Sequence, residues 1–149
     1  MNKSEILKKQ EREWVELPFL EELKKLGWEI LELSKAQTPS QSFRESFSEA
    51  ILKPKLKEAL QTINPWLESD QIENIIAYLS NYPSNSLLAN NQHFSGLLQT
   101  GLENLVQENR ATKEQNPTVK LVDFKDKTKN DFLAISQLKL KVKAKDNYI

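Results

Sequence analysis

The lysines in the last third of the chain are the residues whose type and spacing could most directly support chemistry. Eight lysines and four aspartates fall between residues 120 and 146. The lysines are residues 120, 125, 127, 129, 139, 141, 143 and 145. Such an excess can contact a nucleic-acid phosphate backbone, with Lys139, Lys141 and Lys143 as the candidate DNA-binding residues. Lysines on a strand can also remain solvated and protect a sheet edge. Composition alone favours this second interpretation, and both stay open.

Other kinds of catalytic site have little support in the sequence. His93 is the only histidine and the chain has no cysteine, so neither zinc binding nor Ser/His/Asp catalysis is indicated. We expect His93 to be a packing or hydrogen-bonding residue. The glycines at 27, 96 and 101 are isolated and form no phosphate-binding loop.

Composition indicates a globular protein with one domain. The chain has 149 residues, 38% of them hydrophobic and 28% charged, with no net charge. A balanced total gives no general electrostatic argument for nucleic acid. The sequence shows neither a membrane-spanning apolar run nor a secretory signal, so the cytoplasm is the default expectation. We expect Trp14, Trp28 and Trp66 to be core or half-buried residues.

The first two-thirds of the chain have the pattern of helices. Apolar residues recur at helical spacing from residue 14 to 26, with a helix break or start near Pro18 and an end at Gly27. Residues 28–33 predict a short strand.

Residues 43–100 predict a run of helices. Apolar spacing predicts helices over 43–51 and 56–63 that meet near Pro54. Asp70 and Glu73 suggest a capping box for the next helix. A further helix over 87–98 ends at Gly101.

The pattern changes after residue 100. Residues 119–124, 130–138 and 138–142 have strand-like character, and a polar connection over 125–130 suggests a loose hairpin. The predicted fold class is therefore α+β, helix-rich in its N-terminal two-thirds and followed by β-strands.

Several segments, taken together and in order, resemble the start of the nuclease domain in the R (restriction and motor) subunit of type I restriction enzymes. No single segment is specific. The segments are residues 16–28, 42–45, 56–60, 63–65, 91–102, 119–124 and 130–138. The resemblance covers roughly residues 11–143.

The resemblance implies a restriction-endonuclease-like domain of the PD-(D/E)xK type. In that family a sheet flanked by helices holds clustered carboxylates, a lysine and usually Mg²⁺ over a DNA phosphate, so that water is activated and charge is stabilised. An ATP-driven DNA motor follows in the whole subunit, and partner subunits supply sequence recognition and methylation. Glu16 is the candidate catalytic acid by this resemblance. The simpler alternative is an exposed glutamate favoured by a helix dipole.

The sequence departs from the family pattern where the catalytic motif belongs. No Pro-Asp pair and no Glu-x-Lys follow residues 130–138, and no ATP-binding loop is present. We therefore interpret residues 1–149 as the N-terminal portion of an R-subunit nuclease domain, truncated before its catalytic motif and inactive alone. Two alternatives are a small non-catalytic protein that binds DNA or restriction subunits, and an inert remnant with an unpaired sheet edge.

Three aspartates near the end of the chain could be mistaken for the missing catalytic acid. Asp131 follows Asn130 and is expected to form a turn or cap. Asp123 is expected to be structural. Asp146 lies near the catalytic position but follows Lys145 instead of a proline, and it remains an alternative.

Overall fold

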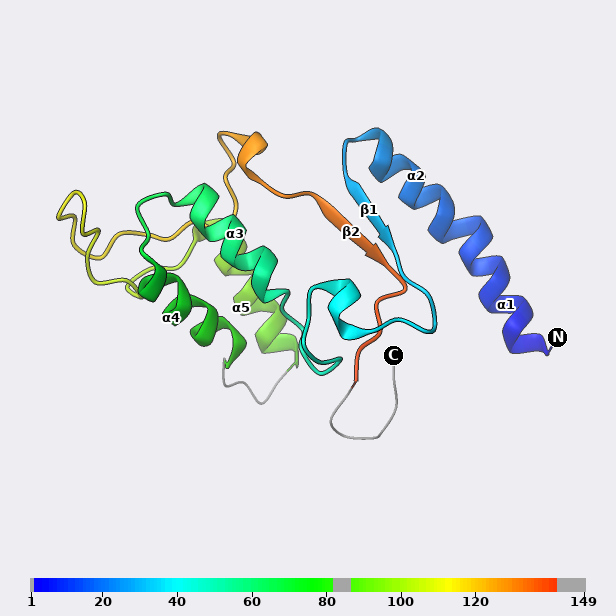
Figure 1. Ribbon diagram of the computed structural model, residues 1–149. Coiled ribbons are helices and arrows are strands. Elements are labelled where there is room, and N and C mark those ends of the chain that lie inside the picture. The colour runs from blue at the N-terminus through cyan, green and yellow to red at the C-terminus, as the bar shows by residue number, and fades with distance from the viewer. Residues whose placement is uncertain (1, 82–86, 142–149) are drawn as a thin grey trace. The chain divides into compact units, whose positions relative to one another are not determined.

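The computed structural model describes residues 2–81 and 87–141 and divides the chain into two compact units (Figure 1). The first unit combines residues 1–42 with 132–149, and the second contains residues 43–131. The second unit is thus inserted in the sequence of the first. The architecture is mixed α+β, as predicted.

The first unit begins with a continuous helical run. It consists of α1 (Lys3–Glu11), a π-helical turn η1 (Arg12–Glu16) and α2 (Leu17–Lys25). Pro18 lies in the first turn of α2 but follows the helical residues of η1, so its missing N–H leaves a gap in the helical hydrogen bonds at the π-helical turn. A helix break or a fresh start was predicted near Leu17; the regular α-helix is interrupted there by the π-helical turn, but the helical run does not start anew. Gly27, with φ of +90°, follows the helix as predicted.

Two short parallel strands complete the first unit. Strand β1 (Glu29–Glu32) pairs with β2 (Leu133–Ser136), Glu29 opposite Leu133 and Glu32 opposite Ser136, and Figure 1 shows them side by side. The central parts of the strands predicted over 28–33 and 130–138 are confirmed.

The predicted hairpin between residues 119–124 and 130–138 is wrong. Strand β2 pairs with β1, and Val119 instead makes an isolated antiparallel bridge to Leu102. Residues 138–141 belong to no strand, and residue 142 lies outside the described residues. The strand-like pattern was real, but the partner is distant in sequence and so could not be identified from local spacing.

Helices form the second unit and enclose its core. They are α3 (Lys53–Ile63), α4 (Ser69–Ser80) and α5 (Leu87–Thr100). Pro54 lies in the first turn of α3, and Gly101, with φ of +83°, follows α5. The buried core residues are Leu60, Leu67, Ile72, Ile75, Leu79, Leu102, Val106 and Val119. The helix boundaries at Pro54 and Gly101 agree with the sequence analysis.

The helix predicted over 43–51 is not formed. Phe43 has φ of +58°, which a right-handed helix does not allow. The buried Arg44 guanidinium donates to the Glu49 carbonyl at 3.0 Å, and the Glu49 carboxylate accepts from the Glu45 N–H at 2.9 Å. These side-chain bonds compete with helical pairing, so the segment is irregular.

The capping box predicted at Asp70 and Glu73 is also wrong. Glu68 is the N-cap of α4, and the Gln71 side chain accepts from the Glu68 N–H at 3.0 Å. Asp70 instead accepts two hydrogen bonds from Arg110, at 2.7 and 2.9 Å, and these bonds lower the pKa of Asp70. The capping box is therefore formed two residues earlier than predicted, by Glu68 and Gln71, and Arg110 contacts both Glu68 and Asp70.

The three tryptophans have different environments. Trp14 is 78% exposed, so its predicted place in the core is wrong. Trp28 is half-buried and its ring centroid lies 5.3 Å from that of Phe132. Trp66 packs against the core of the second unit. The last two agree with the prediction.

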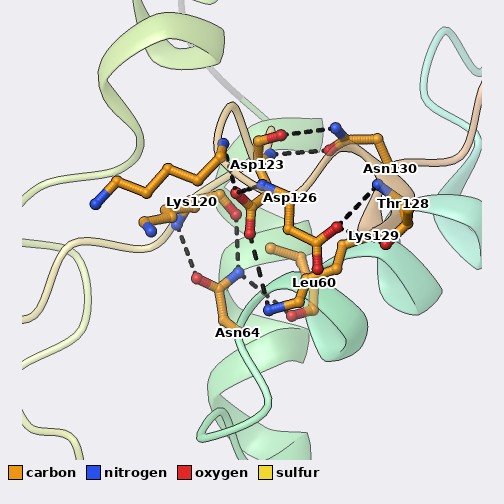
Figure 2. A network of polar contacts seen from close by, with 9 residues as sticks. Leu60, Asn64, Lys120, Asp123, Asp126, Thr128, Lys129 and Asn130 are labelled. Carbon is orange, nitrogen blue, oxygen red and sulfur yellow. Dashed lines mark hydrogen bonds and ion pairs between the residues drawn. The ribbon is translucent and has the colours of Figure 1, made fainter.

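Side-chain amides fix the long segment between α5 and β2. Asn64, at the end of α3, donates to the Lys120 carbonyl at 2.8 Å and accepts from the Lys120 N–H at 2.9 Å (Figure 2). Asn130 brackets Asp123 in the same way, with both distances 2.8 Å. Buried backbone groups need partners, and here they find them on amide side chains.

Replacing Asn64 with alanine tests this pairing. Asn64→Ala leaves the Lys120 N–H and carbonyl without their partner, so we expect a loss of about 1–3 kcal/mol in the free energy of unfolding. Chemical denaturation measures the loss. The matched control is Asn91→Ala, an exposed helix position, which should change stability by less than about 0.5 kcal/mol. Equal stabilities of the two variants would contradict the assignment.

Candidate functional site

The Glu16 carboxylate lies at the carboxyl end of β2. Glu16 is the last residue of η1, and its Oε1 accepts a hydrogen bond from the hydroxyl of Ser136, the last residue of the strand. The Gln137 amide donates to both Glu16 oxygens, at 2.8 and 3.1 Å. Residues 120 positions apart in sequence thus meet at one carboxylate.

The π-helical turn connects this helical run to both strands. The Leu17 N–H bonds to the Arg12 carbonyl, five residues back. The Arg12 guanidinium donates to Glu32, the last residue of β1, at 3.1 Å. Arg12 and Glu16 therefore contact the last residues of two neighbouring parallel strands. Single π-helical turns frequently occur at functional sites.

A buried glutamine joins the segments that follow the two strands. The Gln37 amide donates to the carbonyls of Ser34 and Gln137, at 2.9 and 2.7 Å. Its oxygen accepts from the Lys139 N–H at 3.0 Å. A strand residue in a parallel ladder makes the same pair of bonds, to a carbonyl and to an N–H two residues later. Gln37 thus continues the pairing beyond the last strand residues.

Hydrogen bonding keeps Glu16 ionised. The Ser136 hydroxyl and, next, the Gln137 amide lower the pKa of Glu16 below its usual range, and Arg12 adds a smaller effect. Desolvation opposes this shift but does not outweigh it. Open parallel sheets usually bind their ligands outside the carboxyl ends of the strands. The ionised Glu16 carboxylate lies at such an end.

Glu16 alone does not fit a magnesium site. Within residues 2–81 and 87–141, no three histidine, cysteine, aspartate or glutamate side chains converge to hold a metal ion. Magnesium needs near-octahedral oxygen coordination, whereas both Glu16 oxygens already accept hydrogen bonds from the protein. We therefore derive no step through a metal from this geometry.

The candidate lysines are only partly described. Lys139 is half-buried and its backbone is fixed by Gln37, while Lys141 is exposed. Lys143 and Asp146 lie outside the described residues.

The remaining candidate residues have contacts with residues other than Glu16. Asp131 forms an ion pair with Lys55 at 3.1 Å. Asp123 is buried and accepts from two loop N–H groups, which agrees with a structural role. His93 contacts the Phe94 ring, with centroids 5.7 Å apart.

The sequence did not identify Ser136 and Gln137 as the partners of Glu16, nor Gln37 as the link between the segments after the two strands. Ser136, Gln137 and Gln37 are single polar residues at or just beyond strand ends, and no periodic pattern marks them. The signal that could have indicated them is a polar residue directly after an apolar strand, such as Gln137 after β2.

Comparison with known proteins gives consistent results. Residues 8–149 match the family model described as the type I restriction enzyme R protein N terminus. The chain is 31% identical over 138 residues to the type I restriction enzyme MjaIXP endonuclease subunit of Methanocaldococcus jannaschii, a provisionally named protein. It is 27% identical over 128 residues to the type I restriction enzyme HindI endonuclease subunit of Haemophilus influenzae.

The alignments cover most of this chain but little of its relatives. They include 93% and 85% of the chain, against 13% and 12% of the respective relatives. No solved structure is significantly similar. None of the helices in the described part of the chain has the length and hydropathy of a membrane span.

The pKa shift of Glu16 predicts a dependence of stability on pH. Because the folded pKa is below the unfolded value, the ionised carboxylate stabilises the fold above about pH 4.3, and this stabilisation is lost as the pH falls through the folded pKa. Wild type should therefore be more stable than Glu16→Gln near pH 7, and the difference should shrink in acid. Denaturation at pH 7 and about pH 3 measures it.

A nearby helix glutamate provides the control. Glu21 is exposed on α2 and has no hydrogen-bond or ion-pair partner among the described residues. Glu21→Gln should change stability little at either pH. A difference between wild type and Glu16→Gln that persists undiminished in acid would contradict the role of the ionised Glu16.

Proposed function

Since the chain belongs to the family of type I restriction enzyme R protein N termini, we propose that it forms the N-terminal part of a DNA-cleaving domain in cytoplasmic restriction–modification. The observation that carries the proposal is the Glu16 carboxylate at the carboxyl end of β2. By family resemblance, the catalytic carboxylates and lysine follow this strand. Glu16 would then contribute one acid to a site completed by those residues.

The proposal assigns cofactors and partners to the assembled nuclease. Mg²⁺ would need ligands beyond the described residues, because Glu16 is a single carboxylate. ATP would act only in the motor part of an R subunit. DNA is the proposed substrate, and methylation and specificity subunits are the proposed protein partners. The chain by itself would not cleave DNA.

One observation favours a second candidate function. Hydrogen bonds from Ser136 and Gln137 already engage the Glu16 carboxylate, as expected of a structural acid. The chain would then be a small non-catalytic protein that keeps the fold and binds DNA or restriction subunits. Cleavage by a chimera with and without the Glu16 carboxylate distinguishes the two functions.

The cleavage prediction has two parts. The chain alone, with Mg²⁺ and ATP, should leave supercoiled plasmid intact, because one carboxylate does not assemble a phosphodiester-cleaving site. A chimera in which residues 8–149 replace the aligned segment of the MjaIXP endonuclease subunit should cleave DNA. Glu16→Gln in the chimera should lower cleavage by about 10²-fold, the scale of losing one charge-stabilising group, with ATP hydrolysis unchanged.

The outcomes of this experiment separate the two candidates. Plasmid nicking by the isolated wild type that Glu16→Gln abolishes would refute inactivity of the chain alone. A chimera that hydrolyses ATP and cleaves DNA equally well with Glu16→Gln would refute catalysis by Glu16 and favour the non-catalytic function. Glu21→Gln is the matched control in the same chimera.

DNA binding by the lysines that follow β2 is a separate prediction. Replacing Lys139, Lys141 and Lys143 with alanine should weaken duplex binding and reduce the slope of log affinity against log salt by about 0.9 per lost phosphate contact. Mobility shifts at several salt concentrations measure this. The controls are three exposed lysines of the helices, Lys3→Ala, Lys8→Ala and Lys57→Ala. Unchanged affinity and slope would assign the lysines to a solvated surface.

A further inference from the structure

A second candidate nucleic-acid surface lies on the second unit. The end of α5 and the segment 120–125 line a pocket of about 160 Å³. Two apolar side chains, Leu98 and Phe124, and two lysines, Lys120 and Lys125, are among its lining residues. We call these four residues the Phe124 surface.

Phe124 is presented to solvent. Its side chain is 72% exposed and Leu98 is 51% exposed, so neither belongs to the core. A single exposed apolar residue needs no explanation. Here, two exposed apolar side chains and two lysines line the same pocket and form an amphipathic surface. Such a surface can bind a ligand that has both an apolar face and a negative charge.

Hydrogen bonds fix the backbone on both sides of Phe124. Asn64 bonds to both backbone groups of Lys120, and Asn130 bonds to both backbone groups of Asp123 (Figure 2). The Asp123 carboxylate in turn accepts from the N–H groups of Lys125 and Asp126, both at 2.9 Å. Such preorganisation lowers the conformational entropy lost on binding.

The charge of this segment is positive toward solvent. Lys120, Lys125 and Lys127 are exposed and form no ion pair with the residues that the structure describes. Asp123 is only 6% exposed and its Oδ1 bonds to the loop backbone. Asp126 is exposed and keeps its charge, but four lysines outnumber the two aspartates in residues 120–129. The surface therefore complements a polyanion.

We propose that the Phe124 surface binds single-stranded DNA, with a base stacked on Phe124 and neighbouring phosphates contacted by Lys120 and Lys125. Aromatic rings and lysines together are the usual means of binding single strands. A duplex keeps its bases stacked and could use only the lysines. This site involves neither Glu16 nor the lysines after β2, so it is independent of the proposed nuclease role.

The test uses the full chain and a fluorescent oligo(dT). Phe124→Ala should weaken binding by roughly 5- to 100-fold, because stacking on an aromatic ring contributes that much per base. Phe124→Trp should retain binding. The Lys120→Ala, Lys125→Ala double variant should reduce the salt slope by about 0.7 per lost contact. Fluorescence anisotropy at several salt concentrations measures both effects.

The controls keep the proposal falsifiable. Leu88→Ala removes another exposed apolar residue of α5, outside the pocket, and Lys57→Ala removes an exposed lysine of α3. Both should bind like wild type, and all variants should keep its unfolding midpoint. The proposal is overturned if wild type does not bind oligo(dT) at low salt. It is equally overturned if Phe124→Ala binds oligo(dT) within twofold of wild type, or if Phe124→Ala weakens binding of a duplex of the same length by the same factor. Binding that Glu16→Gln leaves unchanged would separate this site from the nuclease proposal.

Discussion

Side-chain amides are hydrogen-bond partners for backbone groups in the segments between the helices, where strands supply few such partners. Gln37, Asn64 and Asn130 each donate to a backbone carbonyl and accept from a backbone N–H. An amide side chain offers the same donor and acceptor as a peptide group. In the described residues the two strands of the sheet have only four residues each. The long segments around them would otherwise leave backbone groups unpaired, which folded proteins rarely tolerate.

This pairing holds together the segments at the ends of β1 and β2. Parallel order brings the last residues of β1 and β2 to the same edge, opposite each other. Gln37 then continues the contact over a separation of 100 residues, and Asn64 connects α3 to a segment 56 residues away. Glu16 reaches the edge that Gln37 extends. Gln37 therefore holds together the segments that follow the two strands, next to the Glu16 carboxylate.

Local signals in the sequence predicted where elements begin and end. Pro18, Gly27, Pro54 and Gly101 act through their own backbone geometry, so their effects are readable without a partner. The predictions that were wrong concern features that depend on a partner residue. The irregular segment over 43–51 and the capping box at Glu68 and Gln71 both depend on side-chain bonds that periodicity does not report. The partner of β2, and the contact of Glu16 with Ser136, depend on residues about 100 or more positions away.

Trp14 and Glu16 both lie in the π-helical turn, where Trp14 is exposed and Glu16 contacts Ser136. Residues at three-residue spacing drift by about 60° per step around a regular helix, so the apolar positions from 14 to 26 do not share one narrow face. The turn over Arg12–Glu16 adds one residue to the helical repeat, and each residue rotates the helix by about 100°. This rotation does not by itself decide which side chains are buried, because Leu17 and Leu26, after the turn, are exposed whereas Leu20 is buried. Arg12 and Glu16, the first and last residues of the turn, contact the ends of both strands. At the turn, the contacts to the strands are therefore the polar ones of Arg12 and Glu16, while Trp14 is exposed.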